Sequence, residues 1–181
     1  MIETEKKYRL TKNQQEQVRL RLVELGARRI SEEFEENTIY VGAGLEAGSK
    51  ILRLRRVGDR AKLTFKERLS STSPIKRQRE EETSVANPEA MSAILEAVGF
   101  TAALVYEKRR ETWILDETEI VIDELPFGLF MEVEGKESEI EAIEGKLAIK
   151  EFAPEGSTYP QLTLEHGTAC GNVIEARFPK P

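Results

Sequence analysis

The chain has 181 residues, of which 33% are charged and 39% are apolar, and its formal net charge is −6. This acidic balance argues against a nucleic-acid-binding protein, because such proteins use a basic surplus to displace counterions. The single cysteine and the single histidine exclude an internal disulfide, a thiolate zinc site and a histidine-rich metal site.

Helices are predicted at four places along the chain from capping residues and apolar spacing. The first follows Thr11, a good N-cap residue, and ends at Gly26. The second spans residues 87–99, where an Asn-Pro pair supplies a cap and a first-turn proline. The third begins near Ser138, and a short fourth helix is expected around residues 159–165.

Between the helices the apolar residues recur with a period of two, which is typical of β-strands. Strands are therefore predicted at residues 2–10, 28–41, 50–57, 60–68, 76–86, 103–115, 118–124 and 128–135. A polar loop is predicted at residues 68–76, between two of these strands.

Many of the predicted strands carry one apolar face and one charged face. In the third strand, for example, Arg53 and Arg55 share a face, opposite the face that holds Leu52 and Leu54. The simplest explanation is an antiparallel sheet with one solvated side. However, single strands present charges of one sign, which repel each other, and the amphipathic helices need the apolar faces to cover.

We therefore expect the charged faces to meet in a common concavity or inside a closed barrel, with the apolar side turned outward under the helices. A transmembrane barrel would share this polarity, but the interspersed helices and the lack of a signal peptide argue against it.

The expected interior is rich in carboxylates and in cations. Its acidic members would be Glu3, Glu5, Glu80, Glu82, Asp123, Glu132 and Glu134. Its basic members would be Lys7, Arg53, Arg55, Lys62, Lys66, Lys108 and Arg110. Clustered carboxylates without cysteine or histidine favour a hard divalent cation, Mg²⁺ or Mn²⁺, and the basic members need a polyanion. A metal nucleotide or an inorganic polyphosphate satisfies both, and without a Walker motif its phosphates would be held by side chains.

The sequence also resembles a known family. The segment ETEKK at residues 3–7 is similar to the ExExK signature of the CYTH superfamily, also called triphosphate tunnel metalloenzymes. This group includes class IV adenylate cyclases, thiamine triphosphatases and inorganic triphosphatases. Further resemblances follow in order along essentially the whole chain, in the segments LRLRR, LTFK, REEE, EKRR, IDELPFGLFMEVEG and STYPQL.

The resemblance implies an α+β fold that is mainly β, a closed eight-stranded antiparallel barrel that forms a tunnel with helices packed on the outside. It implies phosphate-binding roles for Lys7, Arg53, Arg55, Lys66, Lys108 and Arg110. It implies metal-binding roles for Glu3, Glu5, Glu132 and Glu134, with help from Asp123, Glu80 and Glu82.

The activity expected first is metal-dependent hydrolysis of a triphosphate, with Lys62 and Tyr40 as candidate residues to orient the attacking water. The substrate could be tripolyphosphate, thiamine triphosphate or a nucleoside triphosphate. One alternative is an adenylate cyclase that forms cyclic AMP and pyrophosphate. Against it, Thr38 and Gly42 stand where some cyclase-type members have acidic residues, and no His-Phe pair precedes ETEKK. A second alternative is a polyphosphate-binding module without catalysis.

The remaining expectations concern the protein as a whole. Its length is consistent with one domain over residues 1–181. No apolar run approaches the roughly 20 residues of a membrane helix, and the first residues are charged rather than typical of a signal peptide. We therefore expect a cytoplasmic protein with a small-molecule partner and without a membrane or nucleic-acid partner. The sequence leaves the oligomeric state open, and a homodimer is compatible with it.

Overall fold

The computed structural model describes residues 2–46, 48–69 and 75–179. Most of the loop predicted at 68–76 therefore lies outside the described residues. Within them, no helix is both long enough and apolar enough to cross a membrane.

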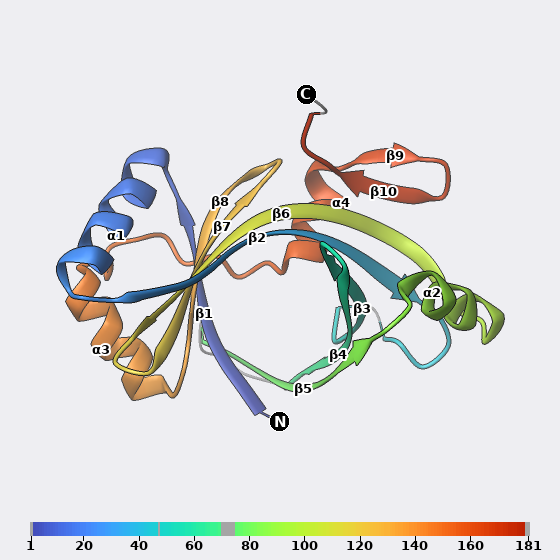
Figure 1. Cartoon of the computed structure of the whole chain (residues 1–181), viewed down its shortest axis with the longest axis horizontal. Helices are drawn as coiled ribbons and strands as arrows, with labels where there is room; N and C mark the ends of the chain where they lie inside the picture. The colour runs from blue at the N-terminus through green and yellow to red at the C-terminus, as the bar shows by residue number, and fades with distance from the viewer. Residues whose placement is uncertain (1, 47, 70–74, 180–181) are drawn as a thin grey trace.

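Eight antiparallel strands form a closed barrel, as predicted (Figure 1). The strands are β1 (Ile2–Leu10), β2 (Arg28–Val41), β3 (Lys50–Val57), β4 (Arg60–Arg68), β5 (Lys76–Val85), β6 (Thr101–Leu115), β7 (Thr118–Leu125) and β8 (Gly128–Glu134). Their order around the barrel is β2-β3-β4-β5-β1-β8-β7-β6, and pairing of β2 with β6 closes the ring. Closure gives the sheet an inner face and an outer face, and alternate residues of each strand point into the lumen or outward.

A short hairpin near the C-terminus extends the sheet and was not predicted. It consists of β9 (Thr168–Cys170) and β10 (Val173–Ala176), and β10 pairs in parallel with β6. The hairpin occupies the edge of β6 next to residues 104–106, beyond the part of β6 that pairs with β7. Strands of three and four residues are too short for a period-two pattern to be recognised in the sequence.

Four helices accompany the strands: α1 (Lys12–Glu24), α2 (Pro88–Ala97), α3 (Glu137–Leu147) and α4 (Tyr159–His166). Thr11 caps α1 through a capping box, as its sequence position predicts, and Gly26 after the helix adopts a φ of 74° that suits glycine. α3 begins at Glu137, close to the predicted start near Ser138, but its N-cap is a different residue. Lys136 rather than Ser138 is the N-cap, because the side chain of Glu139 reaches back to the Lys136 amide.

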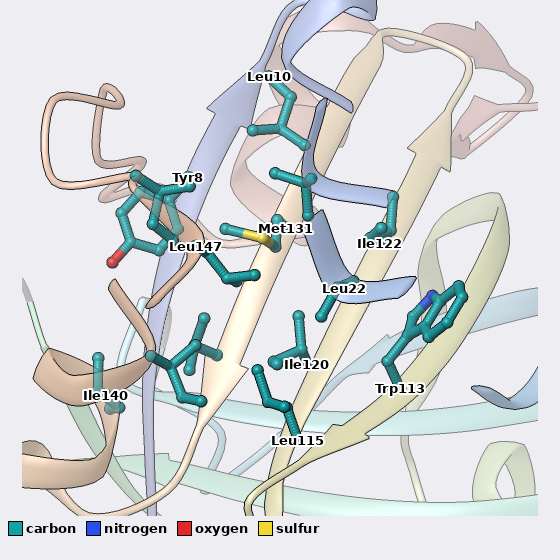
Figure 2. Packing of buried hydrophobic residues seen from close by; sticks show 14 of the residues in the cluster. Tyr8, Leu10, Leu22, Trp113, Leu115, Ile120, Ile122, Met131, Ile140 and Leu147 are labelled. Atoms are coloured by element: carbon teal, nitrogen blue, oxygen red, sulfur yellow. The ribbon is translucent and has the colours of Figure 1, made fainter. Parts of the chain in front are cut away.

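The largest apolar cluster lies outside the barrel, beneath α1 and α3 (Figure 2). Leu22 of α1 and Ile140 of α3 pack there with Ile120 and Met131, which are outward-facing residues of β7 and β8. Trp113, on the face of β6 opposite the lysine and arginine rows, belongs to the same cluster. The apolar faces of the strands are thus covered by helices, and each of these side chains contributes about 2 kcal/mol or more by burial.

A second apolar cluster involves α4 and was not foreseen. Tyr159 and Leu162 of α4 pack against Ile39 and Phe130. Phe130 lies two residues before Glu132 and therefore on the same inward face of β8. Part of the lumen is thus apolar and covered by α4, whereas the sequence pattern predicted a charged interior throughout.

Candidate functional site

Charged side chains from β1, β3, β4, β6 and β8 converge on one cavity inside the barrel. Of the residues predicted for the interior, it is lined by Glu5, Lys7, Arg53, Arg55, Lys66, Lys108, Arg110, Glu132 and Glu134. Glu3, Glu80 and Glu82 line an adjoining hollow together with Glu134. The prediction that the charged rows share an enclosed space, rather than facing bulk water, is therefore confirmed.

Three carboxylates of β1 and β8 gather at one place in this space. Glu3, Glu5 and Glu134 each offer a carboxylate oxygen, and these oxygens lie within 4.8 Å of one another. Strand alternation puts Glu3 and Glu5 on the same face, and the register of β1 with β8 places Glu134 directly opposite Glu5. Within the described residues, Glu134 has no hydrogen bond or ion pair to balance its charge.

Burial and mutual repulsion make it harder to ionise these three carboxylates. Burial raises the pKa of Glu134 to about 8, and the charge of Glu3 adds to the effect. The pKa of Glu3 is raised by burial and by its hydrogen bond with Glu80, and that of Glu5 by burial and by the charge of Glu132. A divalent cation would relieve this repulsion, and three oxygen ligands are the donor set that Mg²⁺ or Mn²⁺ prefers. The residues therefore fit the predicted cation.

The remaining carboxylates of the predicted metal set lie outside this cluster, and each is paired with a cation. Asp123 accepts two hydrogen bonds from Arg110, at 2.8 and 2.6 Å, and Glu132 lies 2.8 Å from Arg110. Glu80 pairs with Lys66 at 2.8 Å, and Glu82 pairs with Lys62 at 2.6 Å. Burial opposes ionisation of all four carboxyls, but their pKa values are lowered all the same. For Glu80 the cause is first a hydrogen bond with Glu3 and then the charge of Lys66, and for the other three it is chiefly the neighbouring cations, which hold the pKa of Glu132 at about 2. The structure brings together three of the seven predicted metal ligands and assigns the other four to ion pairs.

Arg53 differs from the other cations that were predicted to bind phosphate. Lys7, Arg55, Lys66, Lys108 and Arg110 each pair with a carboxylate. Arg53 forms no ion pair with a described carboxylate: its guanidinium contacts the hydroxyl of Thr64 at a long 3.3 Å and forms a hydrogen bond with Tyr106. Its Nε atom is buried without a hydrogen-bond partner. A buried guanidinium donor without an acceptor is unfavourable, so Arg53 is prepared to bind an anion in the cavity.

The two residues predicted to orient water occupy different positions. Tyr40 does not face the cavity: it is buried in the outer cluster beneath α2, and its hydroxyl donates to Ser92 of that helix at 2.9 Å. The interpretation of Tyr40 as a catalytic residue is therefore wrong, because its position in β2 points its side chain outward. Lys62 lies at the rim, half exposed and paired with Glu82.

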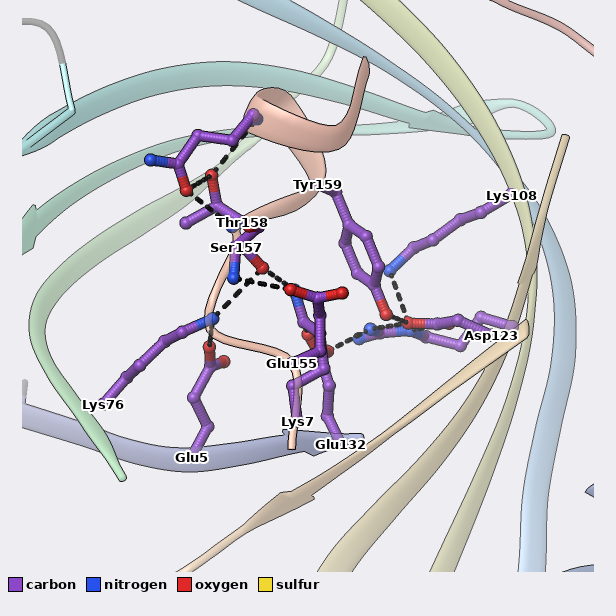
Figure 3. Close-up of polar contacts among 12 residues, drawn as sticks. Glu5, Lys7, Lys76, Lys108, Asp123, Glu132, Glu155, Ser157, Thr158 and Tyr159 are labelled. Carbon is purple, nitrogen blue, oxygen red and sulfur yellow. Dashed lines mark hydrogen bonds and ion pairs between the residues drawn. The ribbon is translucent and has the colours of Figure 1, made fainter. Parts of the chain in front are cut away.

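Several cavity residues were missed by the sequence analysis. Glu35 is 1% exposed and lies 3.2 Å from Arg55 and 3.3 Å from Lys108. Although burial opposes ionisation, these two cations lower the pKa of Glu35 to about 2. Its two-residue spacing from Asn37 in a predicted strand was a signal that could have placed it inside. Tyr159, from α4, also enters the site, where its hydroxyl donates to Asp123 at 2.7 Å (Figure 3).

Comparisons with known proteins bear on the fold and on the family. No curated protein matches the chain. Among solved structures, the PH1012 protein of Pyrococcus horikoshii OT3 is 25% identical, with 88% of this chain and 98% of that chain covered at a TM-score of 0.77. A candidate adenylate cyclase from Vibrio parahaemolyticus is 20% identical, with 90% and 97% covered at a TM-score of 0.70. HpAC1 from Hippeastrum, a candidate adenylyl cyclase with a dominant triphosphatase activity, is 17% identical, with 90% and 95% covered at a TM-score of 0.70.

At these identities the last two likenesses show a shared fold. The family comparison goes further, because the model of the CYTH domain matches residues 1–157, which include every strand of the barrel and all the predicted site residues. The chain therefore belongs to the CYTH domain family.

Proposed function

We propose that this protein is an enzyme that hydrolyses a triphosphate inside the barrel with the help of a divalent cation. One observation carries the proposal: among the described residues of the same cavity, Arg53 forms no ion pair with a carboxylate, and Glu134 forms none with a cation. A phosphate chain that carries a divalent metal supplies both missing partners. The dominant triphosphatase activity of the Hippeastrum relative supports the choice of reaction.

The carboxylates of Glu3, Glu5 and Glu134 would hold the cation. When bound, Mg²⁺ or Mn²⁺ would neutralise charge on the phosphate oxygens and so favour phosphoryl transfer to water. Mg²⁺ usually keeps several waters and binds substrate phosphates beside its carboxylate ligands, which suits a small acidic cluster at the edge of a basic cavity.

The chain's own contribution would be to bind and align the phosphates. Arg53 would donate to a phosphate oxygen from its buried guanidinium. Lys66, which lies between Glu3 and Glu80 at 2.7 and 2.8 Å, would contact both the phosphate chain and the acidic cluster. Positioning and charge stabilisation are sufficient for phosphoryl transfer, so a strong general base is not required. The role of Lys62 in orienting water stays a prediction, which its place at the rim leaves open.

A second candidate is the cyclase reaction, in which the ribose 3′-hydroxyl of ATP attacks the α-phosphorus and pyrophosphate leaves. The Vibrio relative, a candidate adenylate cyclase with the same fold, is the observation that favours it. Both reactions would use the same cavity, and only the identity of the product separates them.

The test is a substrate panel with the purified protein. Tripolyphosphate, thiamine triphosphate and ATP are incubated with Mg²⁺, with Mn²⁺ or with EDTA, and orthophosphate, pyrophosphate and cyclic AMP are measured. We expect orthophosphate only with a divalent cation. Cyclic AMP and pyrophosphate would identify a cyclase, and tight tripolyphosphate binding without any product would identify a binding module.

Variants of the acidic cluster sharpen the test. Glu3→Gln and Glu134→Gln should abolish turnover while the fold remains intact by circular dichroism. Glu124→Gln is the matched control, because Glu124 is exposed and pairs with Arg109 on the outside of the barrel. Full activity of both cluster variants would refute the metal assignment, and absence of product from every substrate would refute the enzymatic function.

A further inference from the structure

The N-terminal turn of α4 reaches into the site and contacts several of its charged residues. The helix is capped by Thr158, which forms a capping box with Gln161, and Tyr159 is its first residue. Tyr159 is 6% exposed. Tyr159 and the backbone before it lie among the residues proposed to bind phosphate (Figure 3).

The hydroxyl of Tyr159 holds a buried carboxylate. It donates to Oδ2 of Asp123 at 2.7 Å, and Asp123 is 0% exposed. The same carboxylate accepts two hydrogen bonds from Arg110 and lies 3.4 Å from Nζ of Lys108. Tyr159 therefore fixes the orientation of the Asp123 carboxylate, with which Arg110 and Lys108 both interact.

The ring of Tyr159 lies against two lysines. Nζ of Lys7 is 3.7 Å from the ring centroid, and Nζ of Lys108 is 5.3 Å from it. Lys7 also donates to the carbonyl oxygen of Ser157, two residues earlier, at 3.1 Å. An ammonium over an aromatic face is attracted to it without neutralisation of its charge, so the cation stays available to a phosphate.

The ring itself is fixed by packing. Its centroid is 5.5 Å from that of Phe130, in an edge-on arrangement, and 6.1 Å from that of Tyr106. Both neighbours are fully buried. A ring that packs against buried aromatic residues and lies close to two ammonium groups provides a rigid surface for the lysines.

We propose that Tyr159 is a positioning residue for phosphate binding in the tunnel: its ring directs Lys7 and Lys108, and its hydroxyl fixes Asp123 and, through it, Arg110. The inference rests on the proposed function, because the ligand is the triphosphate. It adds that α4 takes part in substrate binding as well as in packing.

The experiment compares Tyr159→Phe, which removes only the hydroxyl, with Tyr159→Leu, which also removes the aromatic face. Tyr8→Phe is the matched control. Tyr8 is also buried and donates to a carboxylate, that of Glu144, at 2.6 Å, but on the outer face of the barrel. For each protein, kcat and KM are measured with tripolyphosphate and Mg²⁺, and the Kd of tripolyphosphate is measured by calorimetry.

We expect the KM and Kd of Tyr159→Phe to rise about fivefold, as for loss of one hydrogen bond to a charged network. For Tyr159→Leu we expect a rise of at least about tenfold. In both variants kcat should stay within about twofold of wild type, because the reacting groups remain. Tyr8→Phe should lose about as much stability as Tyr159→Phe does, but its KM should not change.

The outcomes separate this inference from the function on which it rests. If wild type turns over tripolyphosphate and both Tyr159 variants keep its KM, the inference is overturned and the function stands. If wild type binds tripolyphosphate without turnover, the proposed function fails, and the Kd of Tyr159→Phe still decides the inference. If Tyr8→Phe shows the same rise in KM, the effect of the Tyr159 variants is general destabilisation and the inference is overturned. If wild type does not bind tripolyphosphate, both the inference and the proposed function are overturned.

Discussion

Replacement of Glu35 by glutamine should destabilise the barrel and should do so in a pH-dependent way. Glu35 is buried inside the barrel, within 3.3 Å of both Arg55 and Lys108. Both cations are themselves largely removed from water, and burial lowers the pKa of Lys108 to about 8 even with Glu35 beside it. Removal of the carboxylate would leave two desolvated cations with less compensating charge, which is a costly type of core substitution.

The magnitude follows from the pKa of Glu35, which is about 2 in the folded protein against an ordinary value of 4.5. A pKa difference of about 2.5 corresponds to about 3.4 kcal/mol of stability at pH 7. Because the folded-state pKa is the lower one, this stability is fully present above about pH 4.5 and is lost as the pH falls toward 2. At pH 3 the same relation leaves about 1.4 kcal/mol.

The assay is denaturant unfolding of wild type and Glu35→Gln at pH 7 and pH 3. We expect the variant to be about 3 kcal/mol less stable at pH 7 and the difference to shrink by more than half at pH 3. Glu32→Gln is the control, because Glu32 forms only an exposed pair with Arg29 and should change stability by less than about 0.5 kcal/mol. A Glu35 variant as stable as wild type at pH 7, or a difference that does not depend on pH, would refute the reasoning.

Three further predictions concern other parts of the molecule. Arg53→Met should weaken tripolyphosphate binding at least about tenfold by calorimetry. Its melting temperature should stay nearly unchanged, because no described carboxylate loses an ion-pair partner. A clear loss of stability with unaltered binding would contradict this prediction. Glu134→Gln should raise the melting temperature at pH 8 without divalent cations. The folded-state pKa of Glu134 is about 8 against an ordinary pKa of 4.5, so the carboxyl destabilises the fold increasingly as the pH rises above 4.5. An unchanged or lower melting temperature would contradict this prediction. Leu22→Ala should cost about 3 kcal/mol in denaturant unfolding, since Leu22 is 0% exposed in the largest apolar cluster, and a loss below about 1 kcal/mol would show that the cluster collapses around the cavity.

The strands and their faces could be predicted because they depend on local alternation. Arg53 and Arg55 alternate with Leu52 and Leu54, and the structure places the arginines inside and the leucines under α2. The same reasoning brought Glu3 and Glu5 onto one face. Their meeting with the carboxylates of β8 could not be derived from spacing, because it depends on pairing between strands more than a hundred residues apart, and there the family resemblance was the guide.

The errors have physical reasons of the same kind. Tyr40 was singled out without regard to its parity in β2, where residues such as Glu35 face inward and Tyr40 faces α2. Ser138 is a better cap than Lys136 by residue type, but the chain leaves β8 directly into the helix, and the Glu139 side chain supplies the capping contact. The role of Tyr159 depends on α4 folding back onto the lumen, a tertiary arrangement that no local pattern records.

The carboxyl groups of the tunnel fall into two sets, one with lowered and one with raised pKa values, and the neighbouring residues determine the direction of the shift. Asp123 and Glu132 lie among cations, ionise readily and hold those cations in place. Glu3, Glu5 and Glu134 lie close to one another, and burial makes their charges unfavourable in the folded protein even though Lys66 pairs with Glu3. Any ligand that compensates these charges binds the folded state alone and so stabilises it by mass action.

The two behaviours assign separate tasks to the two groups. Carboxylates with a lowered pKa belong to the scaffold of the basic residues, and their replacement should damage the fold even without a ligand, as argued for Glu35. Carboxylates with a raised pKa weaken the empty protein, and their replacement should strengthen it while removing the response to Mg²⁺. Stability measured with and without metal therefore separates the carboxylates that stabilise the barrel from those that bind the cation. The measurement needs no assumption about the organic group of the substrate.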